Sequence, residues 1–319
     1  TLTGRLSIRT IAGMRFLLFL LIFAASIVAH AAEKNVIFII TDDESPTLGC
    51  YGDPVAKTPA IDAIAADGTL FLNAFATTAS CSASRSVVMS GLHNHLNGQY
   101  GHQHSYHKFA SFLDVVSYSL PRVMTNAGYR TGHIGKYHVA PEEVYHYETY
   151  MKGSGRNAVQ MANASQEFII ADSEKPFFLY FATSDPHRGG GKDGTSEREL
   201  KPDLFGNKPN DGSHEGVDEV FYDPADVIIP HFLTDTPETR EELAQYYQSI
   251  SRVDRGVARL VEILKEADLY DKTMIVFTAD HGMAFAGGKT TVYEGGLHVP
   301  FVVRNPYEKN RGVKHEGMI

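Results

Sequence analysis

Tryptophan is absent from this chain of 319 residues, and cysteine occurs only twice. Two cysteines cannot build a disulfide framework or a cysteine-rich zinc module, which excludes the small stapled folds. Positive charge is also scarce, with 29 Lys and Arg against 38 Asp and Glu, so no nucleic-acid partner is expected. Glycine and proline occur in ordinary amounts, which excludes collagen-like and low-complexity chains. With 43% hydrophobic residues, the composition indicates a globular protein with a large core.

The first 31 residues have the pattern of a secretory signal peptide. Met14 and Arg15 precede the apolar run 16–28, which ends in an Ala-His-Ala site at 29–31. A positive start, an apolar core and an A-x-A site are the three parts of such a peptide, and the run is short for a membrane span. An uncleaved anchor is the alternative. We expect residues 1–31 to be upstream sequence and signal peptide, and the protein to be secreted or periplasmic, or lysosomal in an animal.

Short apolar runs alternate with helical patterns along the rest of the chain. After Thr236, apolar residues recur at helical spacing as far as Leu264, and a shorter helix is expected at Pro59–Asp67. Strands that alternate with helices indicate an α/β fold with a largely parallel central sheet and helices on both faces. The expected strands are Asn35–Thr41, Arg130–Gly135, Phe177–Ala182, Thr273–Thr278 and Val299–Val303.

We expect residues 32–319 to form one domain. The segment 183–235 is rich in Gly, Pro and Asp and is expected to be a long excursion at the sheet edge, where substrate loops are common. Only a short segment separates the last expected strand from Ile319, so we expect this domain to be C-terminally incomplete.

Charged side chains follow four of the expected strands, at the sheet edge where open α/β folds bind ligands. Asp42 and Asp43 come directly after the first strand, and Asp280 and His281 lie just beyond the fourth. Adjacent carboxylates repel each other, so such a pair favours a bound cation, and oxygen ligands select Ca²⁺ or Mg²⁺. A nitrogen ligand from His281 is less usual for Ca²⁺, and a simple loop cap is the alternative for the Asp pair. The other two strands lead to Lys136 and His138, and to His187.

Cys81 opens a Ser-rich segment that is expected to begin a helix. Backbone N–H groups and the helix dipole favour an anion at this position. Arg85, one turn later, can point at the same anion. A buried structural thiol is the alternative for a lone cysteine near an arginine.

The same segment resembles the sulfatase signature, with Ala83 where that family normally has Pro and Ser90 where it commonly has Thr. Further motifs agree with the family in order along residues 35–303. The matching segments are Cys81-x-Ala83-Ser84-Arg85 with Ser90-Gly91, Thr41-Asp42-Asp43, Gly135-Lys136-Tyr137-His138, Asp185-Pro186-His187, Ala279-Asp280-His281-Gly282, Lys289 and Tyr293-Glu294-Gly295-Gly296.

The resemblance implies an alkaline-phosphatase-like fold and oxidation of Cys81 to formylglycine by a formylglycine-generating or equivalent maturating enzyme. A hydrated aldehyde offers one hydroxyl for attack on sulfur and a second whose deprotonation expels sulfate, whereas a plain thiol would trap the sulfuryl group. The implied ligands of Ca²⁺, or alternatively Mg²⁺, are Asp42, Asp43, Asp280, His281 and position 81. The other implied site residues are Arg85, Lys136 and Lys289 on the sulfuryl oxygens, His187 as general acid and His138 as the base for the second hydroxyl.

Three stretches, 138–145, 176–188 and 222–237, resemble the heparan N-sulfatase group within the sulfatases. This resemblance implies a sulfated saccharide substrate, with N-sulfoglucosamine of heparin-type chains as the expected target, and a homodimer as one option. Two alternatives stay open: a phosphonate monoester or phosphodiester hydrolase of the same superfamily, and an inactive glycan-binding homologue.

Several other residues receive less specific predictions. Cys50 is expected to be small and buried behind the Asp pair, with no disulfide to Cys81. Arg252 and Arg255 are expected on a solvated face of the long helix. A run of histidines is expected to line a polar loop near the pocket mouth, with a transition-metal site as the alternative. These are His93, His95, His102, His104 and His107.

Overall fold

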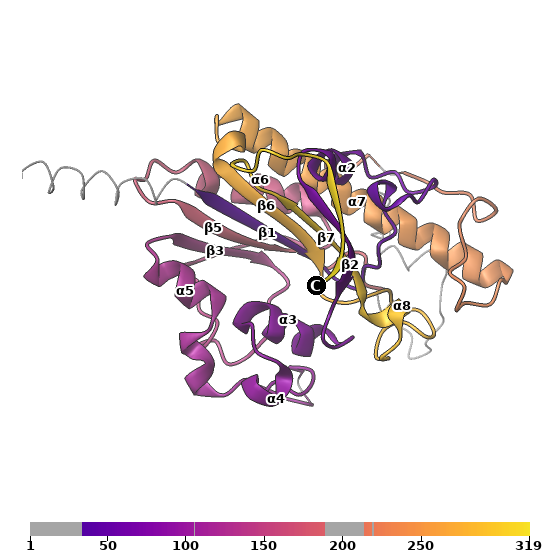
Figure 1. Cartoon of the computed structure of the whole chain (residues 1–319), viewed down its shortest axis with the longest axis horizontal. Coiled ribbons are helices and arrows are strands. Elements are labelled where there is room, and N and C mark those ends of the chain that lie inside the picture. Colours follow the sequence, from indigo (N-terminus) through magenta and orange to yellow (C-terminus); the bar gives the residue numbers. More distant parts are fainter. Residues whose placement is uncertain (1–33, 105, 189–213, 219) are drawn as a thin grey trace, which may run out of the picture.

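The computed structural model describes residues 34–104, 106–188, 214–218 and 220–319 (Figure 1). The expected signal peptide lies outside the described residues, as does part of the expected excursion, 189–213. Among the residues described, no helix is both long enough and apolar enough to cross a membrane.

A mixed sheet occupies the centre of the described chain, with the strand order β4-β3-β5-β1-β6-β7-β2-β8. The strands from β4 to β6 run parallel to one another, whereas β7 is antiparallel to both of its neighbours. The predicted α/β class with a largely parallel sheet is confirmed, with β7 as the reversed strand. The strands are β1 Asn35–Thr41, β2 Thr69–Phe75, β3 Arg130–Gly135, β4 Thr149–Met151, β5 Phe177–Ala182, β6 Thr273–Ala279, β7 His298–Arg304 and β8 Val313–Met318.

Helices cover both faces of this sheet (Figure 1). Ile37 and Ile39 of β1 join one buried cluster with α2, α6 and α7, while Ile40 joins another with α3. This division follows from the alternation of side chains along a strand that is buried on both faces. The helices are α2 Pro59–Ala66, α3 Cys81–Ser90, α4 Asn94–Asn97, α5 Leu120–Asn126, α6 Ala158–Ile170, α7 Pro237–Glu266 and α8 Glu294–Leu297, with short 3₁₀ turns at Gly49–Tyr51, Leu113–Ser117 and Tyr270–Lys272.

Helix α7 begins where the sequence predicts, because the Thr236 hydroxyl accepts a hydrogen bond from the Thr239 N–H at 3.2 Å. The prediction that Arg252 lies on a solvated face of this helix is wrong. Its side chain is 1% exposed and donates two hydrogen bonds to Asp185. A buried guanidinium needs such a partner, so this part of α7 faces the end of β5 rather than solvent. Arg255, three residues on, is half-buried.

Helix α2 also begins at the predicted residue, but its cap comes from elsewhere in the chain. Thr58, directly before the helix, makes no side-chain capping bond. The carboxylate of Asp254 on α7 instead accepts hydrogen bonds from the N–H groups of Ala60 and Ile61, at 2.9 and 2.8 Å. A carboxylate at this position satisfies free N–H groups and favours the positive end of the helix dipole. The start of α2 is therefore fixed by a tertiary contact.

Candidate active site

The carboxyl ends of β1 and β6 place three acidic residues side by side. Thr41 pairs with Ala279 in the sheet register, so Asp42, Asp43 and Asp280 leave neighbouring strands at the same level. Asp280 Oδ1 accepts the N–H of Asp43 at 3.0 Å and that of His281 at 2.9 Å. Asp43 has a left-handed backbone, with φ of 66°, that turns it beside Asp280. The predicted ligand residues thus meet at one point.

These residues have the chemistry of a site for a hard cation. Asp42, Asp43, Asp280 and His281 are all at most 1% exposed. His281 Nε2 lies 3.2 Å from Asp43 Oδ1, and its Nδ1 lies 2.9 Å from the Gly282 carbonyl oxygen. A proton on Nδ1 would be donated to that carbonyl, which leaves the Nε2 lone pair directed at the carboxylates. Buried carboxylate oxygens with one neutral imidazole nitrogen fit Ca²⁺ or Mg²⁺.

Cys81 is the first residue of α3, as its sequence context predicts, and it lies next to this group of ligands. Its Sγ is 3.4 Å from His281 Nε2 and 3.8 Å from Asp43 Oδ1, and the residue is 2% exposed. Burial, followed by the charges of Asp42 and Asp280, raises the pKa of the Cys81 thiol. A protonated thiol is a poor nucleophile. Position 81 thus lies beside the ligand group, but an unmodified cysteine there would be a weak nucleophile.

The two cysteines are free, as predicted, so no disulfide ties Cys50 to Cys81. Cys50 is half-buried rather than buried, and its N–H donates to Asp62 Oδ1 at 2.7 Å. The thiol at position 81 is therefore available to other partners.

Three basic residues surround the carboxylates. Lys136 pairs with Asp42, and Lys289 Nζ lies 2.8 and 2.9 Å from the two oxygens of Asp43. Burial alone would raise the pKa of Asp42, but the charges of Lys136 and Arg85 hold it well below its usual range. Burial and the neighbouring Asp42 raise the pKa of Asp43. The site thus contains both an acidic group that can hold a cation and basic groups that can bind an anion.

Arg85 lies deeper than the two lysines. The sequence predicts that it points at an anion near the start of α3. In the structure its Nε donates a hydrogen bond to Asp280 Oδ2 at 2.9 Å, and one of its Nη atoms donates to Asp42 Oδ1 at 3.3 Å. Its side chain is fully buried. In this arrangement the guanidinium holds two of the carboxylates in place.

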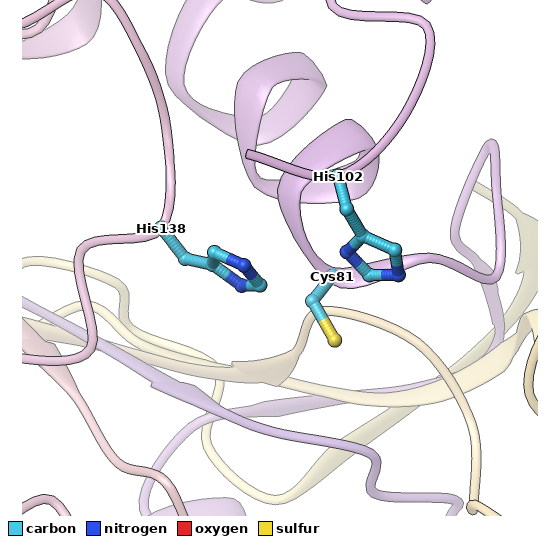
Figure 2. A group of neighbouring side chains, drawn as sticks. All are labelled: Cys81, His102 and His138. Atoms are coloured by element: carbon cyan, nitrogen blue, oxygen red, sulfur yellow. The ribbon is translucent and has the colours of Figure 1, made fainter. Parts of the chain in front are cut away.

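The two predicted catalytic histidines both lie close to the acidic group. His187 Nε2 is 3.9 Å from Asp43 Oδ2, and His138 lies beside Cys81 (Figure 2). Burial lowers the pKa of His187 to about 4, with Asp42 opposing and Lys289 reinforcing the shift. Burial and the charge of Lys136 lower the pKa of His138 to about 3. Both imidazoles are therefore neutral at pH 7.

Sequence reasoning missed the residues that hold the His187 turn. Arg156 donates to Asp185 Oδ1 at 3.3 Å and to the carbonyl oxygen of His187 at 2.6 Å, while Arg252 binds the other oxygen of Asp185. No local motif marks either arginine, because both partners are distant in sequence. Of the histidine run, the structure brings His102 and His104 next to His138, and His102 Nε2 lies 3.2 Å from Ser80 Oγ.

The family model for sulfatases matches residues 34–318, and the chain belongs to the sulfatase family. It is 36% identical over 290 residues to human N-sulphoglucosamine sulphohydrolase, covering 88% of this chain and 57% of that protein. It is 31% identical to an ulvan-active sulfatase of Formosa agariphila, covering 87% of this chain and 50% of that protein. The chain thus spans about half the length of these curated relatives.

Solved structures share this fold. A protein in complex with its substrate D-glucosamine-2-N,6-O-disulfate superposes with a TM-score of 0.63 at 19% identity, covering 89% of this chain and 73% of that one. The phosphonate monoester hydrolase of Agrobacterium radiobacter superposes with a TM-score of 0.59 at 18% identity, covering 89% and 70%. The fold is therefore common to sulfatases and phosphonate hydrolases, and it does not separate the two activities.

Proposed function

We propose that this protein hydrolyses sulfate esters or sulfamates of glycans, and that N-sulfoglucosamine of heparin-type saccharides is its substrate. The observation that carries the proposal is the position of Cys81 Sγ, 3.4 Å from His281 and 3.8 Å from Asp43 at the start of α3. The similarity to N-sulphoglucosamine sulphohydrolase supports the choice of the sulfamate.

In this proposal Asp42, Asp43, Asp280 and His281 hold Ca²⁺, or Mg²⁺, beside a formylglycine formed from Cys81. When bound, the cation supplies Lewis-acid chemistry: it favours deprotonation of a neighbouring hydroxyl and offsets charge on sulfuryl oxygens. The raised pKa of the Cys81 thiol supports the need for a different nucleophile at this position.

The lysines bind the sulfate group of the substrate. Their side chains are 16% and 17% exposed, so Lys136 and Lys289 reach solvent from the buried carboxylates. Each ammonium donates hydrogen bonds to Asp42 or Asp43 in this structure. When a cation neutralises those acids, the ammonium can donate to sulfuryl oxygens instead. Arg85 keeps Asp42 and Asp280 aligned throughout.

The histidines move protons in this mechanism. His187 is 32% exposed at its side chain, so it can face the leaving nitrogen or oxygen of the sugar. The negative charge of a bound sulfate raises the pKa of this imidazole from its low value and favours the protonated form that acts as the acid. His138, neutral beside position 81, accepts the proton whose removal releases sulfate.

The test is side-by-side turnover of an N-sulfoglucosamine oligosaccharide, an aryl sulfate and an aryl phosphonate by the full-length protein. The proposal predicts sulfate release from the N-sulfo sugar at a kcat/KM above that for the phosphonate. Preferred turnover of the phosphonate would assign the chain to phosphonate hydrolysis. Tight glycan binding without turnover, with intact Cys81, would make it an inactive homologue.

The proposal includes the route by which the enzyme matures. Conversion of Cys81 requires a formylglycine-generating or equivalent enzyme. We propose that the active protein is secreted or periplasmic. A homodimer is the assembly to be tested, by light scattering of the purified protein.

A further inference from the structure

A second group of potential metal ligands meets at Cys81. One side-chain atom each from Cys81, His102 and His138 lies within 4.8 Å of the others (Figure 2). The three residues come from the start of α3, the loop after α4 and the loop after β3. Segments far apart in the sequence thus converge on the sulfur.

The two imidazoles of this group have ring nitrogens without a partner in the described part of the chain. Nδ1 of His102 and Nδ1 of His138 are both buried and accept or donate no hydrogen bond there. The rings stack at 5.5 Å between centroids, with 20° between their planes. An unpaired polar atom in a buried position costs free energy, so two such atoms on rings that approach one thiol suggest a missing common partner.

The contact of His102 with Ser80 favours this role. His102 Nε2 lies 3.2 Å from Ser80 Oγ. If Nε2 carries the proton and donates it to the hydroxyl, Nδ1 keeps its lone pair for a metal, the arrangement typical of ligating histidines.

We infer that the unmodified thiol form of this protein binds Zn²⁺ through Cys81, His102 and His138, with water as the fourth ligand. One thiolate and two imidazoles are a soft donor set that suits Zn²⁺ rather than Ca²⁺. Binding forms the Zn–S bond and releases the thiol proton to solvent, with no change of oxidation state. Replacement of the sulfur by an aldehyde or its hydrate removes the soft ligand and with it the zinc site.

Position 81 therefore stands between two kinds of metal site. The atom at this position lies within reach of both ligand groups. The oxygen form would serve the Ca²⁺ or Mg²⁺ group with the carboxylates and His281, whereas the sulfur form binds zinc with His102 and His138. This inference does not depend on sulfatase activity, since its evidence is metal binding by the thiol form.

The experiment is a Co²⁺ titration of the full chain with Cys81 shown by peptide mass spectrometry to be unmodified. Co²⁺ serves as the spectroscopic probe for Zn²⁺. With excess Mg²⁺ present to occupy the carboxylate site, the inference predicts a sulfur-to-cobalt charge-transfer band in the near ultraviolet that saturates with Co²⁺ and is lost when Zn²⁺ is added. Cys81→Ser abolishes the band, and His102→Ala or His138→Ala weakens Co²⁺ binding at least tenfold, about the smallest loss typical even of outer-shell partners.

Two matched variants make the test specific. His104 touches both rings, with centroids 4.7 Å from His102 and 5.3 Å from His138, but lies outside the ligand group. His104→Ala therefore keeps the band and the affinity. A band that survives His102→Ala and disappears in His281→Ala places the metal with Asp43 and overturns the inference, as does the absence of any band from wild-type thiol protein with a native circular dichroism spectrum.

Discussion

Asp185 Oδ2 accepts two hydrogen bonds from the guanidinium of Arg252, at 3.1 and 2.9 Å, across 67 residues of sequence. Both side chains are at most 2% exposed. Arg156 binds the other carboxylate oxygen and the carbonyl oxygen of His187, so the turn after β5 is held from two sides. The carbonyl oxygen of Asp185 also accepts the N–H of Asp42 at 3.3 Å. This pair links the turn that carries His187 to the strand end that carries the cation ligands.

Arg252→Ala should lower the free energy of unfolding by about 3 kcal/mol or more, because it leaves the buried carboxylate of Asp185 with one partner fewer. Arg252→Lys should recover only part of this, since an ammonium cannot reproduce the two parallel N–H bonds. Urea denaturation measures both effects. Arg122→Ala, on the exposed surface of α5, is the control and should change stability by less than about 0.5 kcal/mol. Equal losses in the two alanine variants would contradict the role of the buried pair.

Asp254→Ala should destabilise the protein by about 1–3 kcal/mol, because it removes the acceptor of two N–H groups at the start of α2. Asp254→Asn keeps an Oδ1 acceptor for both bonds and should be milder. Thermal or urea unfolding distinguishes the two variants. A loss for Asn as large as that for Ala would show that charge, rather than hydrogen bonding, fixes the helix.

The same residue predicts a pH dependence of stability. Burial raises the pKa of Asp254 to about 7, against an unfolded value of about 4. Between these two pH values the folded state binds more protons than the unfolded state, so stability falls as pH rises from about 4 to about 7. Asp254→Asn removes this contribution, and the free energy of unfolding measured across that range should become flatter. An unchanged slope in the Asn variant would contradict the raised pKa.

Asp280→Ala should reduce bound metal and turnover together, because it removes one of the proposed cation ligands. It also removes the acceptor of hydrogen bonds from Arg85 and from two backbone N–H groups at the site. Metal content by elemental analysis and sulfate release measure the two effects. Asp172→Ala, in the exposed loop before β5, is the control that should keep both. Retention of metal and activity in Asp280→Ala would remove this residue from the site.

His187→Ala should slow substrates with poor leaving groups most. An amine or sugar alcohol needs a proton from the general acid, whereas a nitrophenolate leaves without one, and general-acid catalysis typically contributes about 10²–10⁴-fold. The comparison is kcat for an N-sulfo sugar against kcat for a nitrophenyl sulfate. His231→Ala replaces an exposed histidine and should leave both rates unchanged. Equal losses on the two substrates would argue for a role in binding instead.

The sequence predicts much of the sheet, because the central strands are continuous apolar runs. The bounds of β1, β3 and β5 agree with those predicted. The strand β2 was not predicted, since Thr69–Phe75 is interrupted by Asn73 and is only partly buried. The reversed direction of β7 depends on its pairing with β2 and β6, which no local pattern records.

More of the catalytic and ligand residues could be predicted from the sequence than of the residues that hold them in place. Most of the proposed catalytic or ligand residues follow a strand or begin a helix, and the exceptions are Arg85 inside α3 and Lys289 in the loop between β6 and α8. Arg252 and Asp254 act through partners on distant elements, and their local pattern resembles that of any polar helix face. The hydrophobic periodicity of a sequence does not reveal tertiary contacts of this kind.

The central claim is that position 81 acts as formylglycine beside a cation. The most direct measurement is peptide mass spectrometry of the segment around Cys81, in preparations whose sulfate release from N-sulfoglucosamine saccharides is also measured. The account predicts an aldehyde at position 81 in active protein, with activity in proportion to the converted fraction and none in Cys81→Ala. Full activity in protein whose Cys81 is entirely an unmodified thiol would contradict it.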